Sequence, residues 1–265
     1  MTKTSSGFGG GEVVSSLCTA DRTSITVRGK DYCRDIIGGM SLSGFIFFHL
    51  TGREASEAEA KMLDALIISI AEHGLSPTAL AARITYAAAP DALQGAVAAG
   101  ILGAGPVLLG SADETAALLA EGVAMIEAGT SREDAARQLA KRVKAEGGKL
   151  AGFGHPLHKP DDPRTVRLLE LAEQYGVTGP HTAFLADLSA AANKVWGRDL
   201  VVNVQAAIGA ISTDMGLPPF LSRAIPILAR AIGVLGHVAE EAERPIGINA
   251  VMTVYREARY DPPSE

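Results

Sequence analysis

The spacing of apolar residues along this chain is that of helices, with very little strand-like alternation. Apolar side chains recur every three or four positions through most of the sequence, which places them on one face of a helix. The clearest stripe consists of Met62, Leu63, Leu66, Ile67 and Ile70. Only residues 23–31 show a strand pattern, in which Ile25 and Val27 alternate with polar neighbours before a glycine. The pattern predicts a mainly helical protein that has one short β-hairpin and no internal repeat.

Helix boundaries are marked by capping residues and by glycine or proline. Ser or Thr followed three residues later by Glu forms a capping box, Pro is favoured at the first helical position, and Gly ends helices. The predicted starts are Ser56 with Glu59, Ser111 with Glu114, Thr130 with Glu133, and Asp162 with Pro163. The helix after Thr130 is expected to stop at Gly147–Gly148, and two apolar helices are expected at about residues 181–196 and 219–242.

Composition indicates a sizeable core and excludes some partners. The 265 residues are 47% hydrophobic and 20% charged, which is typical of a globular protein rather than a disordered one. The net charge of −6 argues against nucleic acid or an anionic membrane as the main partner, although a locally basic pocket is still compatible with it. The apolar stretch 219–242 contains Arg223 and Arg230, so we do not expect it to span a membrane.

The first 22 residues predict a mobile N-terminal tail. They are polar and glycine-rich and lack the basic-then-apolar organisation of a secretory signal, so we expect a cytoplasmic protein. Cys18 and Cys33 are then most simply reduced, buried thiols, and a disulfide between them stays open as the alternative.

The segment "GFGHPLHKPDDPR", residues 152–164, cannot lie in the middle of a helix. Its two glycines permit unusual backbone angles, and its three prolines each remove a donor and restrict the preceding residue. It predicts an ordered loop that offers His155, His158, Lys159 and Arg164 to an anionic ligand. The alternative is a surface turn that carries these charges without a ligand.

A second glycine-rich segment, "GILGAGPVLLG" at residues 100–110, contains the letters of a dinucleotide-binding pattern. No strand precedes it and no βαβ unit surrounds it, so the match is unspecific. We expect these glycines to allow close backbone packing at a helix junction.

Taken together, six ordered blocks carry a family resemblance. They are "VRGKDYCRDIIGG…FIFFHLTGREASEAEAKML", "AEHGLSPTALAARI", "GAVAAGILGAGPVLLGSADE", "GFGHPLHKPDDPR", "NVQAAIGAISTDMGLP" and "LARAIGVLGHVAEEAERP". In sequence and spacing they resemble the citrate synthase superfamily over nearly the whole chain, including the nine-residue step from His155 to Arg164. The resemblance implies an all-α, two-domain fold with a short N-terminal β-hairpin. It places a large domain at 23–112 and 214–265 and a small domain at 113–213.

The resemblance also implies an active site in the cleft between the domains of an obligate homodimer. Members of the superfamily join or split a carbon–carbon bond between a 2-oxo acid such as oxaloacetate and the acetyl group of acetyl-CoA. Arg164, Arg230 and Arg244 match the positions that bind the carboxylates, a task that suits the planar guanidinium. In the family the last of these arginines reaches across from the other subunit, so Arg244 is expected to act in trans.

Two histidines match the family's catalytic positions. His73 and His155 correspond to the pair that holds the substrate oxygen, where an imidazole polarises a carbonyl or accepts a hydroxyl proton. The alternative for each is a histidine satisfied by a neighbouring group. Gly154, His158 and Lys159 lie where the family brings coenzyme A close, although a solvated cation is an equal interpretation of Lys159. The other histidines, at positions 49, 181 and 237, match nothing catalytic and are expected to be packing or surface residues.

One departure from the family distinguishes subfamilies. Citrate synthases begin an HGGA motif with a histidine that stabilises the acetyl-CoA enolate, but the tetrad here reads "LGSA" and begins with Leu109. Leucine neither donates to nor accepts from a thioester oxygen. The citryl-CoA-cleaving module of ATP-citrate lyase also has an apolar residue there, and it shares the "EHG" of residues 72–74. The sequence is therefore closest in character to citryl-CoA lyase.

A second departure affects the catalytic carboxylate of the family, whose position is taken by Gln205. A carboxamide has no proton to exchange near neutral pH, and loss of a general base typically costs about 10²- to 10⁴-fold in rate. Three explanations stay open. Another residue such as Asp214 supplies the proton, the substrate is a related acyl-CoA, or the protein binds without turnover.

The sequence predicts a dimeric citryl-CoA lyase-like enzyme that splits a citryl-CoA type thioester into acetyl-CoA and oxaloacetate. The alternatives are a catalytically silent protein that binds a CoA ester or tricarboxylate, and an atypical citrate synthase. We expect no metal, because no cluster of His, Cys and Asp has ligand spacing. We expect no tightly bound cofactor either, since coenzyme A enters as part of the substrate and leaves with the product.

Overall fold

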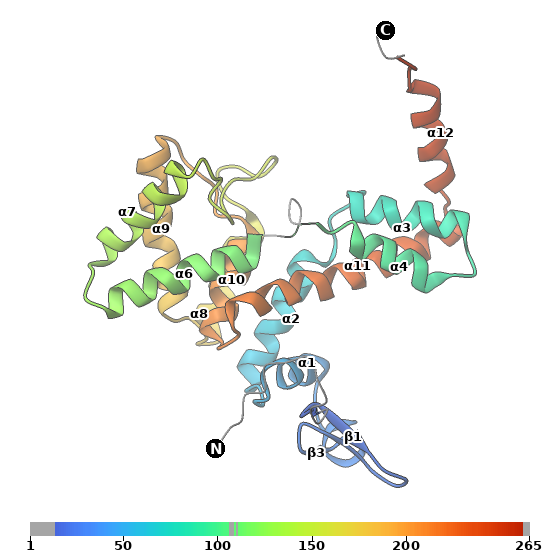
Figure 1. Cartoon of the computed structure of the whole chain (residues 1–265), viewed down its shortest axis with the longest axis horizontal. Helices are drawn as coiled ribbons and strands as arrows, with labels where there is room; N and C mark the ends of the chain where they lie inside the picture. The colour runs from blue at the N-terminus through green and yellow to red at the C-terminus, as the bar shows by residue number, and fades with distance from the viewer. Residues whose placement is uncertain (1–13, 106–108, 110, 262–265) are drawn as a thin grey trace, which may run out of the picture. The chain divides into compact units, whose positions relative to one another are not determined.

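The computed structural model describes residues 14–105, 109 and 111–261 (Figure 1). The chain divides into two compact units, residues 1–60 and 61–265. Helices dominate both, and the strands of the described residues are confined to the first unit. The all-α prediction is therefore confirmed. The predicted division into a large domain (23–112 and 214–265) and a small domain (113–213) stays a prediction.

The first unit combines a small sheet with short helices. Its elements are β1 (Cys18–Ala20), β2 (Ile25–Val27), β3 (Lys30–Asp31), the π-helix η1 (Tyr32–Ile36), α1 (Leu42–Thr51) and the first turn of α2 (Glu57–Ala71). The strands pair antiparallel in the order β1-β2-β3, with Thr26 opposite both Thr19 and Asp31. Val27, Ile36 and Phe48 are buried together and form the unit's core.

Strand β1 corrects the prediction that residues 1–22 form a mobile tail. The Asp21 carboxylate accepts hydrogen bonds from the backbone N–H groups of Thr23 and Ser24, which lower its pKa to about 2 and turn the chain between β1 and β2. The predicted hairpin therefore has a third strand. Residues 1–13 of the predicted tail lie outside the described residues.

The prediction of buried thiols was wrong. Cys18 in β1 and Cys33 in η1 are both exposed, and both are free. Neither segment has enough neighbouring apolar structure to cover a thiol, because the core of this unit is small.

The second unit consists of helices. They are the remainder of α2, α3 (Pro77–Ala88), α4 (Leu93–Leu102), α6 (Ser111–Glu127), α7 (Arg132–Ala145), α8 (Pro163–Gln174), α9 (Pro180–Trp196), α10 (Val204–Asp214), the 3₁₀-helix η2 (Pro219–Arg223), α11 (Ala224–Glu243) and α12 (Gly247–Glu257). In α2 all five residues of the predicted apolar stripe are buried.

The predicted helix starts agree with the structure in two of four cases. Ser56 and Glu59 form the reciprocal capping box, and Asp162 caps α8 by accepting the N–H of Arg164. Ser111 is helical and is not a cap, and Leu109 before it is helical too. At α7 the cap is Ser131, which accepts the N–H of Asp134, so the predicted cap lies one residue too early. Two adjacent hydroxyl residues at positions 130 and 131 both satisfy a capping pattern, and the chain uses the second.

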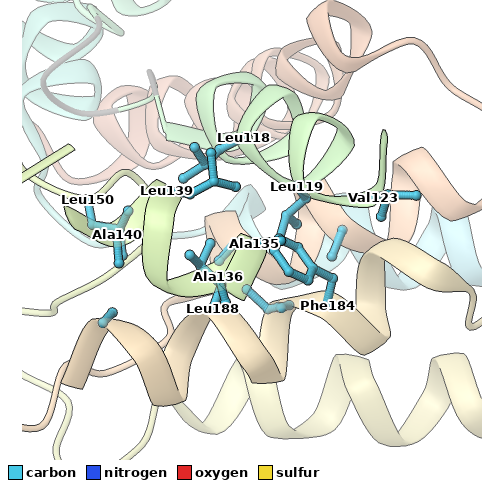
Figure 2. Packing of buried hydrophobic residues seen from close by; sticks show 14 residues of the cluster. Leu118, Leu119, Val123, Ala135, Ala136, Leu139, Ala140, Leu150, Phe184 and Leu188 are labelled. Atoms are coloured by element: carbon cyan, nitrogen blue, oxygen red, sulfur yellow. The ribbon is translucent and has the colours of Figure 1, made fainter. Parts of the chain in front are cut away.

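One apolar cluster lies between α6, α7, α9 and α10 (Figure 2). In Figure 2 the ring of Phe184 on α9 lies against Leu119 of α6, and Leu139 of α7 lies close to Leu118. Helix α10 is enclosed, since every residue from Val204 to Ser212 is buried. The first residues of α10 are consequently held in a fixed place, and the site is built around them.

A second cluster joins α3, α4 and α11 through Ala82, Ala96, Val234 and Val238. Gly100 contributes to this packing, because a Cβ there would lie 2.8 Å from a methyl group of Val234. For Gly100 the expected role of close packing is confirmed, while residues 106–108 and 110 of the same motif lie outside the described residues.

The segment Pro219–Glu243, which contains η2 and α11, is long and apolar enough to cross a membrane by length and composition. Its residues instead take part in packing, since α11 contacts α3 and α4 and its buried residues include Arg230. Such a helix is expected in the core of a helical protein, and a buried arginine would be costly inside a bilayer.

Candidate functional site

A cavity of about 110 Å³ brings together most of the predicted site residues. It is lined by Ile70, His73, Ser76, Thr78, Leu109, His155, Arg164, Asn203, Val204, Gln205 and Arg230. The titratable side chains among these are two histidines and two arginines. The cavity is therefore a positively charged hollow with an apolar wall, which is the chemistry expected for an anion that also carries uncharged groups.

The loop that begins at Gly152 is attached to the segment that leads into α10. Phe153 forms an isolated antiparallel bridge with Val202, and the N–H of Gly154 donates to the carbonyl of Val201 at 2.6 Å. Gly152 has φ of +80°, and a Cβ there would lie 2.4 Å from Thr115 Oγ1, so only glycine fits. These contacts fix the loop before it reaches His155.

The imidazole of His155 is held in one tautomer. Its Nδ1 accepts the backbone N–H groups of Leu157 at 3.1 Å and His158 at 2.9 Å, so the ring proton resides on Nε2. Burial and the neighbouring His158 ring, stacked at 4.3 Å between centroids, lower the pKa of His155. A neutral His155 thus presents an N–H donor at Nε2. The terminal nitrogen of Arg164 that lies 3.4 Å from Nε2 is also a donor, so in this tautomer the two atoms are neighbours without a hydrogen bond between them.

Arg164 is fixed by a fully buried carboxylate. Asp162 accepts Arg164 Nε at 3.0 Å and a terminal nitrogen at 2.9 Å, and it also accepts the N–H of Val204 at 3.1 Å. Burial alone would raise the pKa of Asp162, but the hydrogen bonds from Arg164 and Val204 outweigh burial and lower it. The ionised Asp162 therefore ties the start of α8 to the start of α10 and holds the guanidinium at the cavity.

Arg230 is a buried cation whose Nε has no hydrogen-bond partner within the described chain. Burial, followed by the charge of Arg164, lowers its pKa, while Glu72 acts in the opposite direction. An uncompensated buried charge costs several kcal/mol in effective terms. A protein retains such an arrangement where an anion binds, so Arg230 is the strongest single indication of an anionic ligand.

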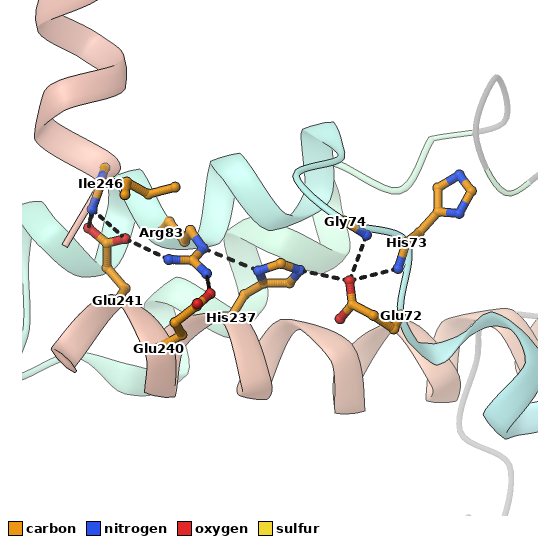
Figure 3. Close-up of polar contacts among 9 residues, drawn as sticks. Glu72, His73, Gly74, Arg83, His237, Glu240, Glu241 and Ile246 are labelled. Carbon is orange, nitrogen blue, oxygen red and sulfur yellow. Dashed lines mark hydrogen bonds and ion pairs between the residues drawn. The ribbon is translucent and has the colours of Figure 1, made fainter. Parts of the chain in front are cut away.

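His73 stands on the turn that follows α2. Glu72 Oε1 accepts the N–H groups of His73 at 2.9 Å and Gly74 at 2.6 Å, and the His73 ring points away from that carboxylate (Figure 3). Burial and the charges of Arg164 and Arg230 lower the pKa of His73. At neutral pH the ring is consequently neutral and can accept a proton.

Gln205 and Leu109 occupy the cavity wall at the two positions where the sequence departs from the motifs of citrate synthases. Gln205 is buried, with its carbonyl oxygen Oε1 unpartnered among the described residues. Leu109 is 3% exposed and presents only apolar atoms. This part of the site therefore offers no carboxylate, and Gln205 supplies amide polarity in its place.

Asp214, which the sequence offered as a substitute proton donor, is engaged elsewhere. Its side chain is 1% exposed and accepts the N–H groups of Gly179, His181 and Thr182 at the start of α9. His181 Nδ1 also lies within hydrogen-bond distance, 2.8 Å from Asp214 Oδ1. A carboxylate committed to a helix N-terminus is a structural anchor, and it does not line the cavity.

Four predicted residues do not line the cavity. Gly154 accepts Asn203 Nδ2 through its carbonyl at 3.0 Å, and His158 stacks on His155. Lys159 and Arg244 are exposed. Their expected roles toward coenzyme A and across a dimer stay predictions.

The sequence analysis did not find the residues that hold the predicted site residues in place. Asn203 accepts the N–H of Gln205 on Oδ1 and binds Gly154 with its amide, so it joins both sides of the cavity. Asp162 was recognised as a helix cap without its second role on Arg164. Ser76 and Thr78, whose hydroxyls lie 2.8 Å apart, follow the His73 turn. In the sequence, only the closeness of Ser76 and Thr78 to His73 could have indicated that they belong to the site.

Two larger hollows lie elsewhere in the second unit. One of about 760 Å³ lies between α7 and α9 and is lined by Arg137, Lys141, Lys144 and Lys194 together with carboxylates and alanines. The other, of about 660 Å³, lies between α8 and α9. Neither holds the histidines of the small cavity, so the chemistry rather than the size selects the site.

Comparison with known proteins identifies the family of this chain. The family described as "Citrate synthase, C-terminal domain" matches residues 23–249. Citrate synthase of Synechocystis is 28% identical over 205 residues, which are 75% of this chain and 49% of that enzyme. The glyoxysomal citrate synthase of Cucurbita maxima is 31% identical over 195 residues, or 70% of this chain and 36% of that enzyme. The chain thus spans about half or less of the length of these relatives.

Solved structures give a fuller match. Citryl-CoA lyase from Hydrogenobacter thermophilus superposes with a TM-score of 0.84 at 29% identity, and the match covers 96% of both chains. A Methanosaeta concilii ATP citrate lyase variant solved in complex with (3S)-citryl-CoA superposes with a TM-score of 0.77 at 20% identity, over 97% of this chain and 43% of that one. The latter likeness concerns the fold alone. The chain belongs to the citrate synthase family and has the character of a citryl-CoA lyase.

Proposed function

We propose that this protein is a citryl-CoA lyase, which cleaves citryl-CoA into acetyl-CoA and oxaloacetate. The observation that carries the proposal is the cavity in which Arg164 and Arg230 stand beside two neutral histidines, with Arg230 Nε unpartnered among the described residues. The likeness to the Hydrogenobacter lyase over 96% of both chains supports the choice of substrate.

The two arginines suit the two free carboxylates of citryl-CoA. Charge-assisted guanidinium–carboxylate pairs are among the stronger polar contacts in proteins. Arg164 is already oriented by Asp162, whereas Arg230 has its Nε unpartnered, so bound substrate would compensate the second charge more than the first. Gly154, His158 and Lys159 are proposed to lie near the coenzyme A portion.

Cleavage is proposed to follow a retro-aldol course. His155 donates from Nε2 to the substrate hydroxyl oxygen, and His73, neutral and with a free ring, accepts the hydroxyl proton. The carbon–carbon bond then breaks, its electron pair passes to the methylene carbon, and the C–O bond becomes the carbonyl of oxaloacetate. The resulting enolate takes a proton from His73 and becomes the methyl group of acetyl-CoA, so the net change is one proton moved from oxygen to carbon.

Gln205 and Leu109 would shape the other half of the site. The Gln205 amide can donate a hydrogen bond to the thioester oxygen of the enolate, but it cannot remove a proton from the acetyl methyl group. Leu109 gives that oxygen no donor. Neither side chain can exchange a proton with the acetyl methyl group, so that proton transfer is assigned to His73.

The experiment follows both directions with purified protein. With citryl-CoA, oxaloacetate is detected by its reduction to malate, and with acetyl-CoA plus oxaloacetate, release of free CoA thiol is detected. The proposal predicts oxaloacetate formation in the first assay and no thiol release in the second. Thiol release in the second assay would instead identify a citrate synthase.

A silent binding protein is the second candidate, because Gln205 replaces the family's catalytic carboxylate. Calorimetry with citryl-CoA distinguishes it from the lyase. Saturable binding without oxaloacetate or thiol release would establish this second candidate and exclude the first.

A further inference from the structure

A series of polar contacts starts at Glu72, next to His73, and connects three helices of the second unit (Figure 3). It runs from Glu72, after α2, to His237 on α11 and on to Arg83 on α3. The close approach of α11 depends on Gly233, where a Cβ would lie 1.9 Å from the carbonyl oxygen of Ala71. A side chain at that position would push α11 away and separate His237 from Glu72.

The orientation of His237 follows from its partners. Arg83 Nε is always a donor and lies 3.2 Å from His237 Nδ1, so Nδ1 accepts and the ring proton resides on Nε2. That Nε2 lies 3.2 Å from Glu72 Oε1 and donates to it. His237 therefore transmits the position of Arg83 to the Glu72 carboxylate.

Arg83 is a firm anchor for this chain. Its side chain is 2% exposed, it donates to Glu241 Oε2 at 3.1 Å, and it is also paired with Glu240. Glu241 in turn accepts the N–H groups of Ile246 and Gly247. With both carboxylates in place, the Arg83 guanidinium has little freedom to move.

The Glu72 side chain must be held in one rotamer. Its side chain is 64% exposed, and an exposed glutamate ordinarily samples several rotamers. Burial tends to raise the pKa of Glu72, but the Gly74 N–H and the His237 ring lower it, so the carboxylate is ionised. In one rotamer its Oε1 accepts the N–H groups of His73 and Gly74 and defines the turn.

We infer that His237 is a positioning residue for His73, acting through the Glu72 carboxylate that holds the His73 turn. The catalytic part of this inference rests on the proposed function, because His73 is there the group that accepts and returns the proton. The inference also changes the status of His237, which sequence comparison left as a packing or surface residue.

The test uses the whole protein and two readouts. Hydrogen–deuterium exchange by NMR reports the His73 and Gly74 amides directly, without any assumption about the reaction. Steady-state cleavage of citryl-CoA reports kcat and KM. The variants are His237→Phe, which keeps a ring but loses both nitrogens, His237→Gln, which restores an adjacent donor and acceptor, and Glu72→Ala. His181→Phe is the matched control, because it also removes a ring nitrogen bonded to a carboxylate but on α9.

In His237→Phe the two amides should exchange at least about tenfold faster. The same variant should lower kcat about 10- to 100-fold with KM little changed, since misplacing a reacting group affects the chemical step. His237→Gln should recover part of both effects, and His181→Phe should leave the two amides unchanged. In the Glu72→Ala background, His237→Phe should change neither amide exchange nor kcat further, because His237 acts only through Glu72.

Unchanged exchange of both amides in folded His237→Phe would overturn the inference, as would full additivity with Glu72→Ala. If His237→Phe does not fold, Glu72→Ala and His237→Gln decide, because Glu72 is exposed and its loss leaves the core intact. Faster exchange without any change in kcat would overturn the catalytic part. Faster exchange in a protein whose wild type cleaves nothing would support the positioning of the turn and refute the proposed lyase activity.

Discussion

At the scale of single residues, the two cavity arginines differ in how they are compensated. Arg164 is paired with Asp162, whereas Arg230 has a buried Nε with no partner among the described residues. Removing a buried charge that lacks a partner can stabilise a protein, and removing one member of a buried pair destabilises it. Replacing each arginine in turn should therefore have opposite effects on stability and similar effects on anion binding.

Arg230→Met should raise the free energy of unfolding by about 1–3 kcal/mol. It should also weaken citrate binding by about 10- to 100-fold, the value of a charge-assisted pair. Arg164→Met should weaken citrate binding too, but it should lower the unfolding free energy by about 3 kcal/mol, because Asp162 is left buried and unpaired. Urea denaturation and calorimetry check both quantities. If Arg230→Met is as destabilised as Arg164→Met, Arg230 has a structural partner and the anion-site interpretation fails.

Titration of the two histidines predicts the acid limit of activity. Burial lowers the pKa of both His73 and His155, aided at His73 by Arg164 and Arg230 and at His155 by His158. In the proposed mechanism the neutral rings are the active forms. As pH falls to about 6.5, the ordinary pKa of histidine, kcat/KM should stay constant, and it should decline only below that pH. A pH profile of kcat/KM for citryl-CoA cleavage checks this. An acid limb centred above pH 6.5 would contradict the environment described for both rings.

Gln205 can be tested by restoring the family's carboxylate. If Gln205 marks a missing base, Gln205→Asp should increase deuterium exchange at the methyl group of acetyl-CoA by about tenfold or more, given the usual contribution of a positioned base. NMR at equal concentrations of folded wild type and variant measures the exchange. Fast exchange in the wild type together with its loss in Gln205→Asp would show that another group already performs this step.

At the scale of elements, Asp214 determines where α9 begins. It is the last residue of α10, and its carboxylate accepts three N–H groups at the N-terminus of α9 as well as the His181 ring. A carboxylate at a helix N-terminus satisfies donors that would otherwise be buried without partners and also interacts favourably with the helix dipole. One side chain thus joins two core helices.

Asp214→Asn should destabilise the protein by about 2 kcal/mol or more at neutral pH. Burial opposes ionisation of Asp214, but the bonds from His181 and Thr182 prevail and lower its pKa below the ordinary value. The folded state therefore favours the carboxylate, so the advantage is complete above about pH 4 and is lost as pH falls through the lowered pKa. Urea denaturation of both proteins between pH 7 and pH 3 checks the prediction. A stability difference that does not shrink on acidification would contradict it.

The sequence predicted helices well where the signals are local. The stripe of α2 and the Asp162–Pro163 start of α8 need only neighbouring residues, and both were found correctly. β1 was missed because a three-residue strand gains its stability from pairing with β2, which local pattern does not report. The cap of α7 was placed one residue early because Thr130 and Ser131 offer the same chemistry.

The site divides in the same way. The pattern of the blocks identified His73, His155, Arg164, Gln205 and Arg230, and all five line one cavity. The supporting contacts could not be predicted, because Glu72 and His237 are 165 residues apart and meet only through the packing of α11 beside α2. Residues that hold other residues carry no distinctive spacing, so three-dimensional packing is needed to find them.

At the scale of the whole molecule, the proposed assembly is a homodimer. Helix α12 supports it, since Ile248, Val251, Met252, Val254 and Tyr255 are all exposed.

Arg244, between α11 and α12, would then reach the partner's cavity. A mixture of Arg230→Ala and Arg244→Ala proteins should recover part of the activity that each has lost alone. Confirmed heterodimers without recovery would contradict the trans role of Arg244.

The most direct test of the account is a single turnover with enzyme in excess over citryl-CoA, quenched and analysed for acetyl-CoA, oxaloacetate, citrate and free CoA. We predict that acetyl-CoA and oxaloacetate form in equal amounts in one exponential phase. The rate should fall about 10²-fold or more in His155→Ala, because the donor to the reacting oxygen is lost. Conversion of citryl-CoA to citrate and free CoA, or recovery of intact citryl-CoA from a saturated site, would contradict the proposed carbon–carbon cleavage.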